Sequence, residues 1–143
     1  MKFDNYMILE FPSKSSNEAF ARSAVSCFAA QMDPTIEELG DIRTAVSEAV
    51  TNAIVHGYPD SMGLITIRCR ILKDHVLDIV IKDKGVGIAD IDKARQPMFT
   101  TGGSDRSGMG FTIMESFMTS LDIASEPGKG TVVHMRRRLQ RRK

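Results

Sequence analysis

The spacing of hydrophobic and polar positions changes along the chain, and each change predicts an element. Apolar residues run through 5–12 and end at Pro12, which predicts a strand. Ser15 and Glu18 then have the Ser-x-x-Glu spacing of a capping box, which predicts a helix start. The face of that helix expected to pack consists of Phe20, Ala24, Cys27, Phe28 and Gln31.

A second helix is predicted to begin at Asp33-Pro34. Asp33 suits the N-cap and Pro34 the first helical position, and the acidic Glu37 and Glu38 suit the positive end of the helix dipole. The helix continues to His56, and Gly57 is expected to be its C-cap. Its apolar positions are Leu39, Ile42, Val46, Ala49, Val50 and Ala53.

Beyond Gly57 the period changes to two, which indicates strands. Residues 65–71 alternate apolar side chains with Thr66, Arg68 and Arg70, and residues 77–83 alternate again up to Asp83. A turn at Lys73-Asp74 joins the two segments. We therefore expect an antiparallel hairpin here.

Residues 84–108 are rich in glycine and polar residues and have no clear period, which is typical of a binding loop or lid. A helix is predicted from Met109 to Phe117. A last hairpin is predicted from residues 121–123 and 131–135, around the turn 127–130. The basic residues 136–143 are read as a solvated tail, with a patch for an acidic partner as the alternative.

The order of elements defines the fold class: strand, two helices, hairpin, long loop, helix, hairpin. Strands joined by hairpins are antiparallel, and the helices between them must cover one face of the sheet. We expect an α/β two-layer sandwich with a mixed, mostly antiparallel sheet and helices on one face. A single domain over residues 1–143 accounts for the length.

Composition narrows the functional classes. The chain is 42% hydrophobic and 26% charged, which excludes a disordered protein, and its net charge of +1 argues against direct nucleic-acid binding. No apolar stretch is long enough to span a membrane and the start lacks the pattern of a secretory signal, so a cytoplasmic location is expected. Cys27 and Cys69 lie in apolar patterns and are interpreted as reduced core residues.

Two motifs could carry chemistry in the first two thirds of the chain. Glu48 and Asn52 lie four residues apart on one helical face, where their oxygens could hold Mg²⁺ or orient a water; a solvated helix face is the alternative. Asp83-Lys84-Gly85-Val86-Gly87 follows a strand. Its aspartate could accept from an exocyclic amine while the glycines admit a flat ring, although an ordinary turn has the same pattern.

Two further motifs follow the long loop. Ser107-Gly108-Met109-Gly110 opens a helix, and free amides at a helix start bind anions. Arg106 directly before it could reach a phosphate, unless it belongs to a plain surface loop. Gly130-Thr131 starts a strand and by itself reads as a hairpin turn.

The order and separation of these four motifs resemble the superfamily of ATPases and kinases that includes DNA gyrase, heat-shock chaperones, histidine kinases and mismatch-repair ATPases. Residues 46–58, 94–101, 106–115 and 17–22 are further similar to bacterial anti-sigma factor kinases, and the similarity covers nearly the whole chain. The resemblance implies a Bergerat-type ATP-binding fold and a serine-protein kinase that uses ATP and Mg²⁺.

The resemblance also implies roles for residues on the phosphate side. Asn52 would ligate Mg²⁺, and Glu48 would orient or deprotonate the attacking serine hydroxyl. Arg106 would stabilise the γ-phosphate. Backbone amides near the phosphates would come from Ser107, Gly108, Met109 and Gly110.

On the base side, the resemblance implies that Asp83 accepts from the adenine amine and that Gly85 and Gly87 make room for the ring. Thr131 would assist Asp83 through a water. Residues 90–107 would form a lid that includes Thr100 and Thr101. Gly102-Gly103 replaces the Lys-Pro often found there, and two glycines add backbone freedom that could slow lid closure.

The implied partners are a sigma factor and an anti-anti-sigma protein, which would compete for Arg22 on the first helix; a plain surface arginine is the alternative. A homodimer through the sheet edge or the first helix is also implied. An ATP-gated sigma-binding module without kinase turnover is the competing hypothesis. A DNA-coupled ATPase is not expected, because it needs a transducer domain after the ATP site and the chain is close to neutral.

Overall fold

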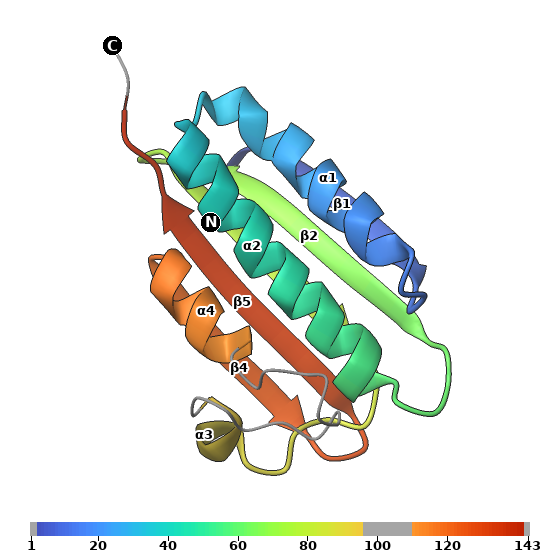
Figure 1. Ribbon diagram of the computed structural model, residues 1–143. Helices are drawn as coiled ribbons and strands as arrows, with labels where there is room; N and C mark the ends of the chain where they lie inside the picture. Colours follow the sequence, from blue (N-terminus) through green and yellow to red (C-terminus); the bar gives the residue numbers. More distant parts are fainter. Residues whose placement is uncertain (1–2, 96–109, 142–143) are drawn as a thin grey trace.

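The computed structural model describes residues 3–95 and 110–141 (Figure 1). Its elements in chain order are β1 (Phe3–Pro12), α1 (Asn17–Ala29), a 3₁₀ turn η1 (Ala30–Met32), α2 (Ile36–Asn52), a π-helical turn η2 (Ala53–Gly57), β2 (Leu64–Leu72), β3 (Val76–Asp83), α3 (Ile91–Ala94), α4 (Gly110–Phe117), β4 (Ser120–Glu126) and β5 (Gly130–Arg138).

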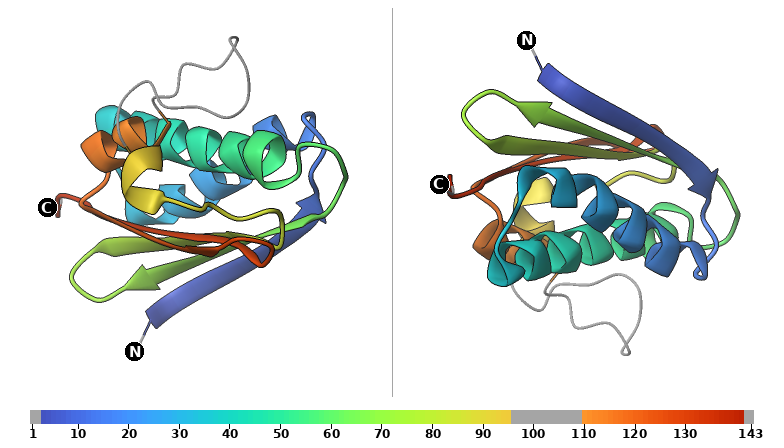
Figure 2. Two further views of the ribbon diagram at one scale, coloured as in Figure 1. Left: turned by 90° about the horizontal axis from the view of Figure 1, so that it is seen from below. Right: turned by 90° about the horizontal axis from the view of Figure 1, so that it is seen from above.

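The strands form one five-stranded sheet in the order β1-β2-β3-β5-β4. The expected two-layer architecture is confirmed, because α1, α2 and α4 lie on one face of this sheet (Figures 1 and 2). Among the described strands, all four pairings are antiparallel, so the sheet is not mixed. The reason lies between β1 and β2: α1 and α2 run out and back, so β2 starts at the end of the sheet where β1 finished.

The core lies between the sheet and the helices. The predicted alternation places Ile65, Ile67 and Cys69 of β2 on the covered face, fully buried. Leu77 and Ile79 of β3 continue this layer, which packs against the helices. The helical side of the core is built mainly from Ala21, Val25, Ile42, Val46, Ala49, Val50 and Met114.

Both predicted helix starts are wrong in position. At α1 the N-cap is Ser16 and its side chain makes no capping bond. At α2 the N-cap is Thr35, whose hydroxyl accepts from the Glu38 amide at 3.0 Å while the Glu38 carboxylate accepts from the Thr35 amide at 2.9 Å. Asp33 instead closes η1 in the left-handed region, at φ 52°, and cannot act as an N-cap there.

The packed face of α1 is rotated from the predicted one. The helix buries Ala21, Val25, Phe28 and Ala29, whereas Phe20 and Cys27 are exposed. Small alanines fit where α1 lies close to its neighbours, and the larger Phe20 points outward. The prediction of a core cysteine is therefore wrong for Cys27 and correct for Cys69, where burial, with a smaller contribution from Asp78, raises the pKa of the thiol to about 12.

The basic end of the chain is not a free tail over the residues that the structure describes. Residues 136–138 belong to β5, and Leu139 is buried in the core. The Leu139 amide donates to the His75 carbonyl at 2.9 Å, and the Gln140 amide donates to Glu38 at 2.8 Å. Strand pairing and these two hydrogen bonds thus attach the described part of this segment to the fold.

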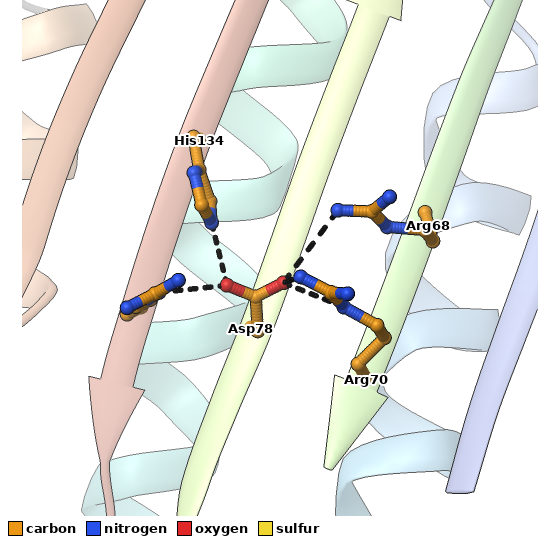
Figure 3. A network of polar contacts seen from close by, with 5 residues as sticks. Arg68, Arg70, Asp78 and His134 are labelled. Atoms are coloured by element: carbon orange, nitrogen blue, oxygen red, sulfur yellow. Dashed lines mark hydrogen bonds and ion pairs between the residues drawn. The ribbon is translucent and has the colours of Figure 1, made fainter. Parts of the chain in front are cut away.

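The uncovered face of the sheet holds a charged network centred on Asp78 of β3 (Figure 3). Arg70 and Arg68 of β2 approach one carboxylate oxygen, at 3.1 and 4.0 Å, and His134 and Arg136 of β5 approach the other, at 2.5 and 2.8 Å. Burial raises the pKa of this carboxyl, but the hydrogen bonds from His134, Arg136 and Arg70 outweigh it, and the pKa lies below its usual value.

Candidate functional site

Asp83 ends β3 on the covered face of the sheet, where it is buried. The β3–β5 register places Thr131 directly opposite it. The Asp83 carboxylate accepts a hydrogen bond from the Gly85 amide at 2.9 Å and another from the Thr131 backbone amide. Burial dominates over these two bonds, so the pKa of Asp83 is raised from its ordinary value.

Gly57 and Gly85 allow two backbone segments to meet beside Asp83. A Cβ on Gly57 would lie 3.0 Å from the Asp83 Cγ atom, and one on Gly85 would lie 1.9 Å from the Gly57 carbonyl oxygen. That carbonyl accepts from the Val86 amide at 2.8 Å. The π-helical turn η2 delivers Gly57 to this position, and Tyr58, not Gly57, is the cap that ends the helix.

Gly87 fixes the loop that follows Asp83. Its φ of +77° lies in the left-handed region, and a Cβ there would come within 2.1 Å of the Glu126 carbonyl oxygen. The Val86 carbonyl, one residue earlier, accepts from the Gly128 amide at 2.7 Å. The loop therefore lies directly against the turn between β4 and β5.

Glu48 and Asn52 of α2 face the start of α4. A Cβ on Gly110 would lie 2.9 Å from the Asn52 Nδ2 atom, 3.2 Å from its Oδ1 atom and 3.3 Å from the Glu48 Oε2 atom. The carboxylate and the amide thus converge on one point at a helix start, and both side chains are half-buried. The predicted Glu48–Asn52 row and Gly110 are brought together.

The two halves of the site share α2 and its π-helical extension. Asn52 ends α2 beside Gly110, and Gly57 ends η2 against Asp83. Gly130 also packs closely beside Asp83, since a Cβ there would lie 2.1 Å from the Asp83 carbonyl oxygen. The structure therefore gathers the predicted residues Glu48, Asn52, Asp83, Gly85, Gly87, Gly110 and Thr131 at one end of the fold.

Six predicted site residues lie outside the described residues: Thr100, Thr101, Arg106, Ser107, Gly108 and Met109. Of the predicted lid, the described part ends at Arg95, directly after α3. There Arg95 forms an ion pair with Glu115 of α4, and the Thr112 hydroxyl donates to the Arg95 carbonyl at 3.4 Å. The segment around the short helix α3 is thereby attached to α4.

Sequence reasoning missed two residues that hold the site in place. The Tyr58 hydroxyl accepts from the Lys84 amide at 2.7 Å and donates to the Leu64 carbonyl at 2.8 Å. Ser125 of β4 joins the Ile88 amide to β5 through its hydroxyl. The Tyr58–Lys84 bond spans 26 residues and the Ser125–Ile88 bond spans 37, and no local pattern could have indicated these two bonds.

Arg22 lies on α1, away from these residues. Its side chain is 35% exposed and pairs with Glu18 one turn earlier, with Nε and Oε2 3.5 Å apart. The exposed ring of Phe20 lies two positions earlier on the same helix. Arg22 is therefore partly accessible on the helical layer. This agrees both with a contact to a protein partner and with a plain surface arginine.

No group of three metal-ligating His, Cys, Asp or Glu side chains occurs within residues 3–95 and 110–141. A divalent ion would instead use the Asn52 oxygen beside the Glu48 carboxylate, and hard oxygen ligands of this kind suit Mg²⁺, which keeps most of its waters. The donor chemistry on α2 therefore fits a magnesium–nucleotide complex. Among the described helices, none is long and apolar enough to cross a membrane.

A two-layer fold with a buried aspartate among closely packed glycines, and a glutamate and an asparagine on the neighbouring helix, is typical of one class of nucleotide-binding domain. The family model of the histidine kinase-like ATPase domain matches residues 11–137. The chain belongs to this family, and within it to the anti-sigma F factors.

Curated relatives carry that second assignment. The chain is 57% identical over 136 residues to the anti-sigma F factor of Caldanaerobacter subterraneus subsp. tengcongensis, covering 94% of each protein. It is 50% identical over 140 residues to the anti-sigma F factor of Geobacillus thermodenitrificans, covering 97% of this chain and 96% of the relative.

Solved structures show the same fold at low identity. The RsbU and RsbW domains of a Mycobacterium tuberculosis protein match 97% of this chain with a TM-score of 0.72 at 20% identity, and the chain spans 34% of that structure. Full-length ShkA in complex with AMPPNP matches 87% of this chain with a TM-score of 0.57 at 17% identity, and the chain spans 29% of it.

Proposed function

We propose that this protein is an anti-sigma factor of the sigma F type that uses Mg-ATP to phosphorylate a serine of an anti-anti-sigma protein. The observation that carries the proposal is the convergence of Asp83, on the base side, with Glu48 and Asn52, on the phosphate side, through Gly57 and Gly110. The names of the 50–57% identical relatives support the sigma factor as partner.

On the base side, Asp83 would accept a hydrogen bond from the exocyclic amine of adenine. Its bonds from the Gly85 and Thr131 amides hold the carboxylate in place and leave further lone pairs for the ligand. The ring would lie beside the loop that follows Asp83. Gly85 and Gly87 let this loop pack against the Gly57 and Glu126 carbonyls, because a Cβ at these glycines would lie 1.9 Å and 2.1 Å from those oxygens.

On the phosphate side, Glu48 would accept the proton of the attacking serine hydroxyl. The serine oxygen then forms a bond to the γ-phosphorus while the bond from that phosphorus to the β–γ bridging oxygen breaks, and ADP leaves. Magnesium bound at Asn52 would supply charge neutralisation. The amide at Gly110, with Gly108 and Arg106 by resemblance, would meet the phosphates.

The decisive experiment combines the purified protein, labelled ATP and the anti-anti-sigma protein. Wild type should place phosphate on a serine, and Glu48→Gln should lower the turnover by roughly 100-fold or more while binding ATP nearly as before. Glu37→Gln is the matched control, an exposed glutamate at the other end of the same helix.

The result also decides between two functions. Absence of phosphoserine, or Glu48→Gln turning over like wild type, would reject the kinase. If the sigma factor were still captured only when ATP is present, the protein would be an ATP-gated binding module, a function that the Gly102-Gly103 sequence in the lid favours.

We also propose that Arg22 contacts both protein partners and that the protein acts in the cytoplasm as one domain. The Arg22 side chain, which is 35% exposed on α1, supports the contact. Arg22→Ala should weaken capture of both the sigma factor and the anti-anti-sigma protein, while Arg43→Ala, an exposed arginine on α2, should weaken neither. Equal behaviour of the two variants would reject this role for Arg22.

Exposed apolar side chains on β1 and α1 support a homodimer. Phe3, Tyr6 and Ile8 of the edge strand β1 are exposed, and so is Phe20 on α1. Apolar side chains at an unpaired sheet edge favour association with a second copy. Sedimentation at micromolar concentration should show a dimer that Ile8→Lys weakens; a monomer at that concentration would reject the dimer.

A further inference from the structure

The Ser125 hydroxyl on β4 makes three contacts beside the base side of the site. The Ile88 amide donates to it at 2.8 Å, it lies 2.8 Å from the Gly130 carbonyl oxygen, and it lies 2.8 Å from the Thr131 hydroxyl. Ile88 begins the segment that leads to α3, and Thr131 is the register partner of Asp83. Ser125 therefore connects the loop after Asp83 to the strand opposite it.

The direction of each hydrogen bond follows from what the groups can do. An amide nitrogen only donates and a carbonyl oxygen only accepts, and a serine hydroxyl has one hydrogen and two lone pairs. The Ser125 hydroxyl must donate its hydrogen to the Gly130 carbonyl oxygen, because a carbonyl oxygen has no hydrogen to donate. One lone pair accepts from the Ile88 amide, so the other must accept the hydrogen of Thr131.

This chain of bonds fixes the polarity of Thr131. With its hydrogen directed to Ser125, the Thr131 hydroxyl can only accept from a ligand or from a water in the pocket. The Asp83 carboxylate, when ionised, also only accepts. Both side-chain oxygens that β3 and β5 present to the base are therefore acceptors, and the pair is buried enough for an unmatched contact to be costly.

We infer that Ser125 is a specificity-determining positioning residue, which selects a 6-amino purine over a 6-oxo purine by holding the Thr131 hydroxyl as an acceptor. This inference rests on the proposed use of ATP. The amino group of adenine supplies hydrogens to such a pocket, whereas the carbonyl oxygen of a 6-oxo purine would face acceptors. Without Ser125, the Thr131 hydroxyl would be free to turn and donate to that carbonyl.

The test compares ATP and ITP, whose bases differ at the 6-position and in the hydrogen on N1, by titration calorimetry on the full chain. Wild type should prefer ATP by roughly 100-fold, and Ser125→Ala should reduce this ratio by about tenfold, mainly through tighter ITP binding. Ser125→Thr, which keeps the hydroxyl, should stay within about threefold of wild type. Because both nucleotides are measured on the same variant, a general loss of stability leaves the ratio unchanged.

A double-mutant comparison separates this role from a merely structural one. In a Thr131→Val background there is no hydroxyl to turn, so adding Ser125→Ala should leave the ratio unchanged within about twofold. Equal loss of ATP and ITP affinity in Ser125→Ala, or the same change of ratio in both backgrounds, would overturn the inference. If wild type bound neither nucleotide, the proposed function itself would fail; ATP binding with an unchanged ratio would overturn only the role of Ser125.

Discussion

Asp78 and Asp83 lie five residues apart on β3, so their side chains point to opposite faces of the sheet. Both are buried, but their surroundings differ. On the open face, four cationic or ionisable side chains approach the Asp78 carboxylate from the two neighbouring strands. On the covered face, the Asp83 carboxylate accepts from the backbone amides of Gly85 and Thr131.

The two pKa shifts record that difference. Burial raises both pKa values, but only at Asp78 do hydrogen bonds from His134, Arg136 and Arg70 reverse the shift. The Asp78 oxygens are saturated with donors, so this carboxylate serves the stability of the sheet. The Asp83 carboxylate can still accept further hydrogen bonds, and it is buried. A hydrogen bond from a ligand to such a group is strong, because the surrounding dielectric constant is low.

The largest effect is expected from Asp78→Asn. The amide cannot neutralise Arg70 and Arg136, and its NH₂ group would face their donors, so we expect a loss of about 3 kcal/mol in the free energy of unfolding. ATP affinity should change less than threefold, because the site lies on the other face. Urea unfolding with Asp122→Asn as control, an exposed aspartate on the same face, measures this. A loss below about 0.5 kcal/mol would show that the network is not stabilising.

Asp83→Asn should give the reverse pattern. Its NH₂ group would oppose the adenine amine and remove a charge-assisted bond, so ATP affinity should fall about 30-fold or more, equivalent to about 2 kcal/mol. The stability of the free protein should stay the same or rise, since a buried charge is removed. Calorimetric titration and urea unfolding on the same variant give both numbers. Wild-type ATP affinity in Asp83→Asn would separate Asp83 from the base site.

Lowering the pH should distinguish the two carboxylates without mutation. The Asp83 pKa is raised above 3.8, so ATP affinity should begin to fall, by up to tenfold per pH unit, while Asp78 is still ionised. The Asp78 pKa is lowered, so the stability that it contributes is complete above about pH 5 and is lost as the pH falls through 3.8 towards its folded value. Asp83→Asn should remove the first dependence and Asp78→Asn the second; equal profiles in wild type and variant would contradict the assignment.

The fold could be predicted from the sequence because the strands have a strict period of two. The alternation in β2 and β3 fixes which face is covered, and the glycines at 85, 87 and 110 mark the close approaches at the site. The packed face of α1 could not be predicted as well. Phe20 and Ala21 are one position apart, and only the space between the helices decides which of them is buried.

The polar networks could not be predicted for a different reason. The Asp78 network requires the register of β2 and of β5 against β3, which places Arg70 and Arg136 on either side of the carboxylate. The contacts of Tyr58 and Ser125 also join distant segments. Asp33 and Thr35 are both residue types that favour an N-cap, so the local sequence does not choose between them. The position of Asp33 at the end of η1 makes Thr35 the N-cap of α2.

The smallest effect is expected at Arg68, and it sharpens the account of Asp78. Arg68 lies 4.0 Å from the carboxylate with its side chain 41% exposed, whereas Arg70 lies 3.1 Å away, is 16% exposed and lies over the Phe3 ring at 5.5 Å. Arg68→Gln should therefore cost less than about 0.5 kcal/mol, and Arg70→Gln about 1.5 kcal/mol, in urea unfolding. Added salt should weaken mainly the Arg68 contribution, because dissolved ions screen the more exposed pair more strongly than the buried one. Equal costs would mean that Asp78 is stabilised by the summed charge of the face, and that the two direct hydrogen bonds from Arg70 have no special weight.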